Sequence, residues 1–188
     1  RFGEEISNVK ELGLLNRGED MKIDVFIESS VSSELSGNMI DLCPVGALNN
    51  KPYRYTARTW DLRQICGISP HDCIGSNINY HTYNNKIVRA VPSENPDINQ
   101  TWLSDRDRFG YEGIYSEDRI KKSQMRVDGK LVEIDFDSIP SQVNNLINNN
   151  IKKHGKEKIG CLISGQSTSE ELFMFQKIFK GLGVSNID

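Results

Sequence analysis

The chain has 188 residues, and 23 Lys and Arg against 26 Asp and Glu give it a formal net charge of −3. This balance excludes a protein whose main partner is a nucleic acid, because binding to a phosphate backbone needs a concentrated positive field. The mean hydropathy is −0.51, and no stretch approaches the roughly 18 consecutive apolar residues of a membrane span. We therefore expect a globular protein with no direct membrane insertion.

The cysteines are few and widely spaced, at Cys43, Cys66, Cys73 and Cys161. This spacing does not suit a dense disulfide framework. It is typical of a reducing compartment, in which thiols stay free or bind metal.

The first section of the chain, residues 1–56, predicts a short helix, an extended run over residues 22–27 and then a helix that ends at Cys43-Pro44. The residue before a proline is pushed out of the α region. Cys43 is therefore expected on a turn, with its sulfur projecting from irregular backbone.

The second section, residues 57–113, predicts a β-hairpin. Residues 77–83 and 86–91 alternate polar and apolar side chains on either side of Asn84-Asn85, and Asn tolerates the positive φ that a two-residue turn needs. A short helix and a turn are expected between Trp102 and Tyr111. This section should be small and rich in β-structure.

The third section, residues 114–188, predicts a hairpin around Asp128-Gly129 and then an α/β unit. A first helix has its apolar residues on one face, namely Ile139, Val143, Leu146, Ile147 and Ile151. A strand is expected over residues 158–164. A capped helix follows from about Ser167 to Lys180, with its inward residues at Leu172, Phe173, Phe175, Ile178 and Phe179. The predicted fold class is α+β, and this section is the start of a parallel-sheet domain.

Cys43-Pro44 is the dipeptide that points most directly to chemistry. In ferredoxin-type clusters the last Cys of the ligand run is followed by Pro, whose fixed φ shapes the turn that presents the thiolate. A single Cys cannot bind a cluster. Taken alone, the dipeptide more often marks a small buried thiol at a helix end.

A longer string around this dipeptide carries a resemblance to a known family. It covers residues 33–48 and continues with Lys51-Pro52-Tyr53, Ala57-Arg58, Gly75-Ser76-Asn77-Ile78, Arg89, Asp97-Ile98-Asn99, Trp102-Leu103-Ser104-Asp105 and Arg108-Phe109-Gly110-Tyr111. The string closely resembles the family of large iron–sulfur subunits of NADH:quinone oxidoreductase, respiratory complex I. The similarity is strong over residues 1–113 and looser beyond them.

The resemblance implies three domains. Residues 1–56 would be the end of a ferredoxin-like 4Fe-4S domain, residues 57–113 a molybdopterin-oxidoreductase-type 4Fe-4S domain, and residues 114–188 the beginning of a molybdopterin-oxidoreductase-like α/β domain. Members of the family in complex I use this last scaffold without the pterin, so no molybdopterin is expected.

The resemblance also implies that Cys43 is a metal ligand and the cofactor-binding residue. In the family one tetranuclear [4Fe-4S] cluster is held by a C-x2-C-x2-C run and by a distant Cys, which Cys43 matches. The run is normally followed by one residue and then Arg-Phe, which correspond to Arg1-Phe2. The other three ligands are therefore expected upstream of this sequence.

Some members of the family carry a second tetranuclear cluster in the section that begins near Ala57. When the spacing of its four ligands is aligned with this chain at Cys73, the other three positions fall on Pro70, Ser76 and Ser104. Only one of the four positions is then a cysteine, so we predict no cluster there. Cys66 and Cys73 could form a structural pair or a zinc site with His71, or be ordinary loop residues, and we favour the last.

The histidines give no catalytic signal, because none has a Cys or Ser partner at a recognisable spacing. His81 is expected on the surface of the hairpin, and His154 at a helix C-terminus, where a cation suits the dipole. The turn at residues 164–167 is a weak phosphate-binding signal that we interpret as structural.

The function that the resemblance implies is electron relay in the peripheral arm of complex I, from NADH and FMN through iron–sulfur clusters toward quinone. Such a chain is an enzyme only as part of that oxidoreductase. Its partners would be other peripheral-arm subunits, including the flavin-binding subunit. Its place would be the cytoplasmic side of a bacterial inner membrane, or the matrix side in a mitochondrion.

Two alternatives belong to other classes. One is a redox-inactive scaffold that packs against partner subunits. The other is a molybdopterin enzyme such as a formate dehydrogenase, against which the missing cysteines of the second cluster argue.

Overall fold

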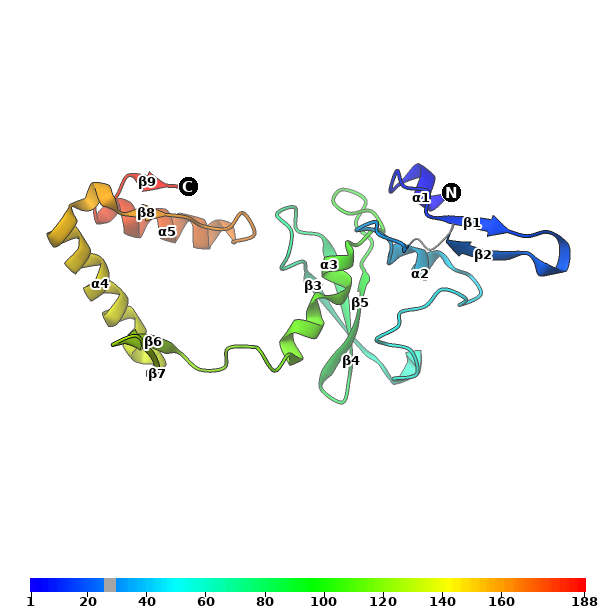
Figure 1. Ribbon diagram of the computed structural model, residues 1–188, viewed down its shortest axis with the longest axis horizontal. Helices are drawn as coiled ribbons and strands as arrows, with labels where there is room; N and C mark the ends of the chain where they lie inside the picture. Colours follow the sequence, from blue (N-terminus) through cyan, green and yellow to red (C-terminus); the bar gives the residue numbers. More distant parts are fainter. Residues whose placement is uncertain (26–29) are drawn as a thin grey trace. The chain divides into compact units, whose positions relative to one another are not determined.

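The computed structural model describes residues 1–25 and 30–188 and divides into two compact units, Arg1–Tyr115 and Ser116–Asp188. Each unit combines helices with small sheets, which confirms the predicted α+β class (Figure 1). Within the described residues, no helix has both the length and the apolar character needed to cross a membrane.

The first unit begins with a one-turn helix, α1 (Phe2–Glu5), and a hairpin of two strands, β1 (Leu12–Leu15) and β2 (Lys22–Val25). The extended run predicted at residues 22–27 is confirmed as far as Val25, and its last two residues lie outside the described range. Strand β1 was not predicted, because four residues that include Gly13 show no usable alternation.

The next helix, α2 (Asn38–Leu42), ends where the sequence predicts. Cys43 follows it in an extended conformation, with φ −76° and ψ 107°, because Pro44 disfavours helical dihedrals in the residue before it. Cys43 thus lies on a turn, as expected.

The central sheet has three antiparallel strands in the order β3 (Arg63–Ile68), β4 (Asn77–Tyr83) and β5 (Lys86–Pro92). The predicted hairpin is confirmed, with Asn84 at φ 48° and Asn85 at φ 60° in its turn. Strand β3 was missed because most of its side chains are exposed, so burial imposes no alternation on its sequence.

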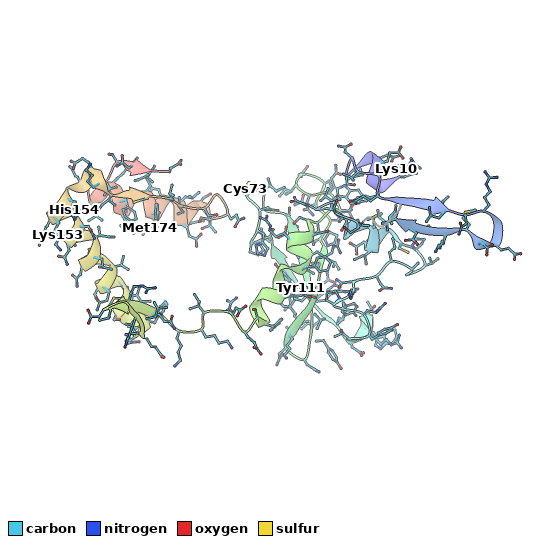
Figure 2. All side chains as sticks on the ribbon, viewed as in Figure 1. Lys10, Cys73, Tyr111, Lys153, His154 and Met174 are labelled. Atoms are coloured by element: carbon cyan, nitrogen blue, oxygen red, sulfur yellow. The ribbon has the colours of Figure 1, made fainter. Side chains whose placement is uncertain are left out.

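The core of this unit lies between the sheet and a short helix, α3 (Asp105–Phe109), with the 3-10 turn that follows it. Its buried apolar residues are Ile78, Ala90, Leu103 and Tyr111. The hydroxyl of Tyr111 donates a hydrogen bond to the carbonyl of Val88 at 2.8 Å. Burial is the main cause that raises the pKa of Tyr111, which is labelled in Figure 2, to about 12.

The second unit holds a hairpin, two longer helices and a short parallel pair of strands. These elements are β6 (Gln124–Val127), β7 (Lys130–Glu133), α4 (Ile139–His154), β8 (Gly160–Cys161), α5 (Ser169–Gly181) and β9 (Asn186–Ile187). Strands β8 and β9 run parallel. The hairpin predicted around Asp128-Gly129 and the helix through Ile139 are therefore confirmed.

Two details of this unit differ from the prediction. The strand expected over residues 158–164 is only Gly160–Cys161, because its partner β9 is equally short. Leu172, Phe173 and Ile178 were predicted to face inward but are exposed, so that prediction is wrong. The two-residue strands offer no sheet surface wide enough to cover them. Helix α5 begins after a capping box formed by Thr168 and Glu171.

Candidate metal centre

The Cys43 turn directs backbone N–H groups at a sulfur atom. The N–H of Leu48 donates to Cys43 Sγ at 3.4 Å. This hydrogen bond is the largest cause that lowers the pKa of the Cys43 thiol, followed by one from Val45. Together with smaller contributions from Ala47 and Gly46, they outweigh the opposing effect of burial. The turn therefore stabilises a thiolate, the form of cysteine that binds iron.

Gly46 gives this turn its shape. Its φ is 67°, a left-handed conformation that residues with a side chain rarely adopt. A Cβ added there would meet nothing within 4 Å. Glycine is therefore needed for its backbone freedom and not for lack of space.

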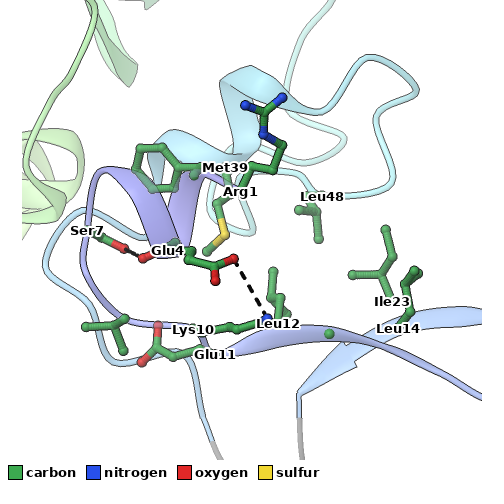
Figure 3. Close-up of a pocket in the computed structure, with 14 residues that line it drawn as sticks. Arg1, Glu4, Ser7, Lys10, Glu11, Leu12, Leu14, Ile23, Met39 and Leu48 are labelled. Carbon is green, nitrogen blue, oxygen red and sulfur yellow. Dashed lines mark hydrogen bonds and ion pairs between the residues drawn. The ribbon is translucent and has the colours of Figure 1, made fainter.

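An apolar hollow of about 480 Å³ lies beside the turn (Figure 3). It is lined by α1, the β1–β2 hairpin and the side chains of Met39 and Leu48, with an ion pair between Lys10 and Glu4 at 3.8 Å on its wall. Leu48 both lines the hollow and donates its N–H to Cys43. The hollow therefore adjoins the Cys43 turn through Leu48, and charged side chains of Arg1, Glu4, Lys10 and Glu11 also line it.

The donor set tests whether Cys43 fits an iron–sulfur cluster. A thiolate supported by backbone N–H groups and followed by proline is a suitable ligand. Across the described residues, no three or more His, Cys, Asp or Glu side chains come together as a metal site. Cys43 therefore fits as one thiolate ligand of a cluster, and the described residues bring no second ligand to it.

The loop over residues 69–76, where the second cluster was considered, is closed by its own carboxylate. Asp72 Oδ1 accepts the N–H groups of Gly75 at 2.8 Å, Ile74 at 3.2 Å and Ser76 at 3.3 Å. Burial raises the pKa of Asp72, but hydrogen bonds from the Ser76 side chain and from these N–H groups outweigh it. The pKa therefore lies below its ordinary value.

A second hydrogen-bonded residue ties the loop to α3. Ser69 Oγ donates to Asp107, which is only 3% exposed, and accepts the N–H groups of His71 at 3.0 Å and Asp72 at 3.2 Å. The first residues of the loop are thus fixed to the helix by one hydroxyl group.

The four positions laid on the second cluster have other roles in the structure. Pro70 and Cys73 are exposed, Ser76 is buried, and Ser104 is the N-cap of α3, with its hydroxyl oxygen accepting the N–H of Asp107 at 3.1 Å. The neighbouring positions 77 and 105 carry Asn and Asp, so a shift by one residue adds no sulfur. That no cluster forms here stays a prediction.

The remaining cysteines show no shared site. All four cysteines of the chain are free, and Cys66 and Cys73 are both exposed. Cys73 lies on the loop, as favoured from the sequence (Figure 2). Cys66 lies on β3 opposite Asn79, so the loop interpretation is wrong for that residue.

His81 is not the surface residue that the sequence predicts. It is half-buried, and its Nδ1 accepts a hydrogen bond from Arg89 Nε at 2.8 Å. Burial and then the Arg89 charge lower the pKa of His81. The guanidinium of Arg89 also lies over the Tyr53 ring, 4.5 Å from its centroid. Tyr53 belongs to the segment after the Cys43 turn. His154, in contrast, ends α4 as predicted.

Sequence reasoning also missed a set of hydrogen bonds between α2 and α3. Both segments belong to the string that carries the resemblance, residues 33–48 and 102–111, but nothing in the string shows that they touch. In the structure Arg108 of α3 forms an ion pair with Asp41 of α2 at 2.6 Å.

Comparison with known proteins finds two matching families in the first unit. Residues 1–49 match the family described as NADH-quinone oxidoreductase subunit 3, ferredoxin-like domain. Residues 62–112 match the family described as NADH-ubiquinone oxidoreductase NDSU1/NuoG-like, 4Fe-4S domain. Residues 1–49 and 62–112 are thus each similar to iron–sulfur domains of NADH-quinone oxidoreductases.

Individual relatives extend the match to nearly the whole chain. The chain is 40% identical over 186 residues, 99% of its length, to the G subunit of NADH-quinone oxidoreductase from Rickettsia typhi. It is 39% identical over the same length to the corresponding protein of Rickettsia prowazekii. Over 187 residues it is 35% identical to the NADH-ubiquinone oxidoreductase 75 kDa subunit of Reclinomonas americana. The chain is thus similar over nearly its whole length to large G-type or 75 kDa subunits of NADH-quinone oxidoreductase, and it spans about 27% of the length of the first of these relatives.

Proposed function

We propose that Cys43 is one ligand of a tetranuclear iron–sulfur cluster that relays electrons in the peripheral arm of NADH:quinone oxidoreductase. The observation that carries the proposal is the convergence of the backbone N–H groups of residues 45–48 on Cys43 Sγ. A cluster bound there would take up and pass on single electrons. The chain's own residues hold its sulfur ligand as a thiolate through the backbone N–H groups of the turn.

Other subunits of complex I, the flavin-binding subunit among them, are the partners we propose. Large apolar side chains after the Cys43 turn support a protein interface, because Val45 is 82% exposed, Tyr55 94% and Trp60 81%. Such an arrangement suits a peripheral subunit on the cytoplasmic or matrix side of the membrane.

The test replaces Cys43 by Ser in the full-length subunit, assembled in its complex. We expect the loss of one tetranuclear cluster, seen as fewer iron and acid-labile sulfide per complex and as one missing electron paramagnetic resonance signal. NADH-to-quinone electron transfer should fall with it, because a relay lacking one centre is interrupted.

Cys73→Ser is the matched control, because Cys73 is an exposed thiol of the same unit. It should leave iron, sulfide and every signal unchanged. If Cys43→Ser also leaves them unchanged, Cys43 is not a ligand and the chain is a scaffold. If Cys73→Ser removes a signal, the prediction that the second site holds no cluster is wrong.

A further inference from the structure

The segment that leads into the Cys43 turn is fastened to α3 of the neighbouring family domain. Ser36 Oγ donates to Asp105 Oδ2 at 2.5 Å, and the N–H of Gly37 donates to Asp105 Oδ1 at 2.7 Å. The N–H of Asp105 donates in turn to the carbonyl of Glu34 at 2.7 Å. One carboxylate therefore holds the start of α2 from two directions.

Asn38, the first residue of α2, continues this contact. It is 1% exposed, and its Nδ2 donates to the carbonyl of Leu103 at 2.8 Å while its Oδ1 accepts the N–H of Leu103 at 2.9 Å. The side-chain amide thus satisfies both backbone groups of Leu103, which itself belongs to the core. Such a pair fixes both distance and orientation.

Arg108 completes the contact from the α3 side. The residue is 1% exposed, and its Nη2 donates to Asn38 Oδ1 at 3.2 Å and to Asp41 Oδ2 at 2.6 Å. Its Nε has no hydrogen-bond partner among the described residues. A buried cation with an unsatisfied donor is weak evidence for stability, and a role in specifying geometry is the alternative explanation.

Gly37 makes room for the arginine. A Cβ built on Gly37 would lie 2.5 Å from Arg108 Cδ and 2.6 Å from Arg108 Nε. Its φ of −61° is open to any residue, so glycine is required here by the close approach of Arg108 and of Asp105 Oδ1, which would lie 2.8 Å from the Cβ. The sequence of α2 is therefore adapted to receive this side chain.

The contact reaches the metal ligand directly. Helix α2 is five residues long, and Cys43 is the residue that caps its C-terminus. Asp41, the partner of Arg108, lies two residues before Cys43. A displacement of α2 against α3 therefore moves the sulfur, and loss of the guanidinium leaves the Asp41 charge uncompensated next to the turn.

We propose that Arg108 is a positioning residue for the cluster ligand Cys43, through which the domain of residues 62–112 fixes the place of the thiolate and sets the local charge. This inference rests on the proposed function of Cys43. It gives the second domain a role in the electron relay that does not need a cluster of its own.

The test uses full-length subunit in the assembled complex, with two variants that disturb the contact differently. Arg108→Gln removes the charge, so we expect the midpoint potential of the Cys43 cluster to fall, because the remaining Asp41 carboxylate disfavours the added electron. Gly37→Ala keeps all charges and displaces the guanidinium, so we expect shifted or broadened g-values with a smaller change in potential. Iron and sulfide content should stay that of wild type.

Each variant has a matched control. Arg106→Gln removes an exposed charge from the same helix, and Gly113→Ala adds a Cβ where nothing lies within 4 Å. Both should leave the potential and the spectrum unchanged, since solvent screens the exposed charge. If the Arg108 and Gly37 variants match these controls at full cluster content, the proposal is overturned.

Three further outcomes remain decisive. If Arg108→Gln prevents assembly, the spectrum and midpoint potential of the cluster are measured in Gly37→Ala and Arg108→Lys instead. Arg108→Lys keeps the charge but not the forked geometry of the guanidinium. If Cys43→Ser keeps the cluster, the proposed function fails. A lost cluster in Cys43→Ser with unaltered spectra in the Arg108 variants defeats only the present inference.

Discussion

Two turns of the first unit gather backbone N–H groups around a single acceptor atom, and they differ in what that atom is. In the turn after α2 the acceptor is the sulfur of Cys43, which accepts the N–H of Leu48. In the loop over residues 69–76 it is Oδ1 of Asp72, which accepts three N–H groups of the same loop. The first acceptor can still bind a metal, whereas the second uses its lone pairs to close its own loop.

The surroundings differ in the same sense. The loop of Asp72 is tied through Ser69 to the buried Asp107 of α3. The Cys43 turn borders a hollow and follows α2, which contacts α3 through the Asp41–Arg108 ion pair. Backbone donors alone therefore do not make a metal site, because the side chain at their centre decides between a ligand and a structural hub.

Among variants that probe the two turns, Asp107→Ala should change stability most, because it removes the acceptor of the Ser69 and Ser104 hydroxyl groups. Loss of two hydrogen bonds to a buried charge should lower the free energy of unfolding by about 3 kcal/mol. Denaturant unfolding of the purified subunit measures this, with the exposed Asp97→Ala as control. If Asp107→Ala also changed the spectrum of the Cys43 cluster, the two turns would not be independent of each other.

A smaller loss is expected for Asp72→Ala, about 1 to 2 kcal/mol, because the loop is partly exposed and water can replace the lost acceptor. The lowered pKa of Asp72 determines how its contribution to stability changes with pH. Its stabilising contribution is present above the unfolded pKa of about 4 and disappears as the pH falls through the folded pKa. The variant should lack this part of the acid destabilisation in unfolding curves recorded between neutral and acid pH, whereas equal curves would contradict the role of Asp72.

Gly46→Ala tests the sulfur side. The left-handed φ of 67° should cost about 1 to 2 kcal/mol with a side chain present. Weaker N–H donation to the sulfur should lower the midpoint potential of the cluster. Gly129→Ala is the control, since it has a φ of 81° and open space but lies in the second unit. A potential that stays constant in both variants would argue against tuning by this turn.

Tyr111→Phe should have the smallest effect, about 1 kcal/mol, from the lost hydrogen bond to Val88. Because the folded pKa of about 12 exceeds the ordinary value near 10, the tyrosine contributes full stability below pH 10. It loses this contribution as the pH rises through 12. Alkaline unfolding should therefore be less steep in the variant, and an identical slope would exclude Tyr111 as its source.

Much of the fold near the candidate site could be predicted where local chemistry decides it. Pro44 ends α2 at Cys43, and Asn84-Asn85 turn the β4–β5 hairpin, because both effects act within two residues. Strands β1 and β3 were missed, since a short or exposed strand carries no alternation. The exposed face of α5 was also misjudged, because amphipathic spacing shows which face is apolar and not whether anything covers it.

By itself the sequence determined that Cys43 sits on an extended turn after a helix and that the chain resembles complex I iron–sulfur subunits. Only the tertiary structure showed that Asp72 closes the second loop and that Arg108 reaches Asp41. The effects of proline and asparagine on the backbone are steric and local, so they can be predicted from the sequence. The Arg108–Asp41 pair joins residues 67 positions apart, and its existence depends on how α3 packs against α2.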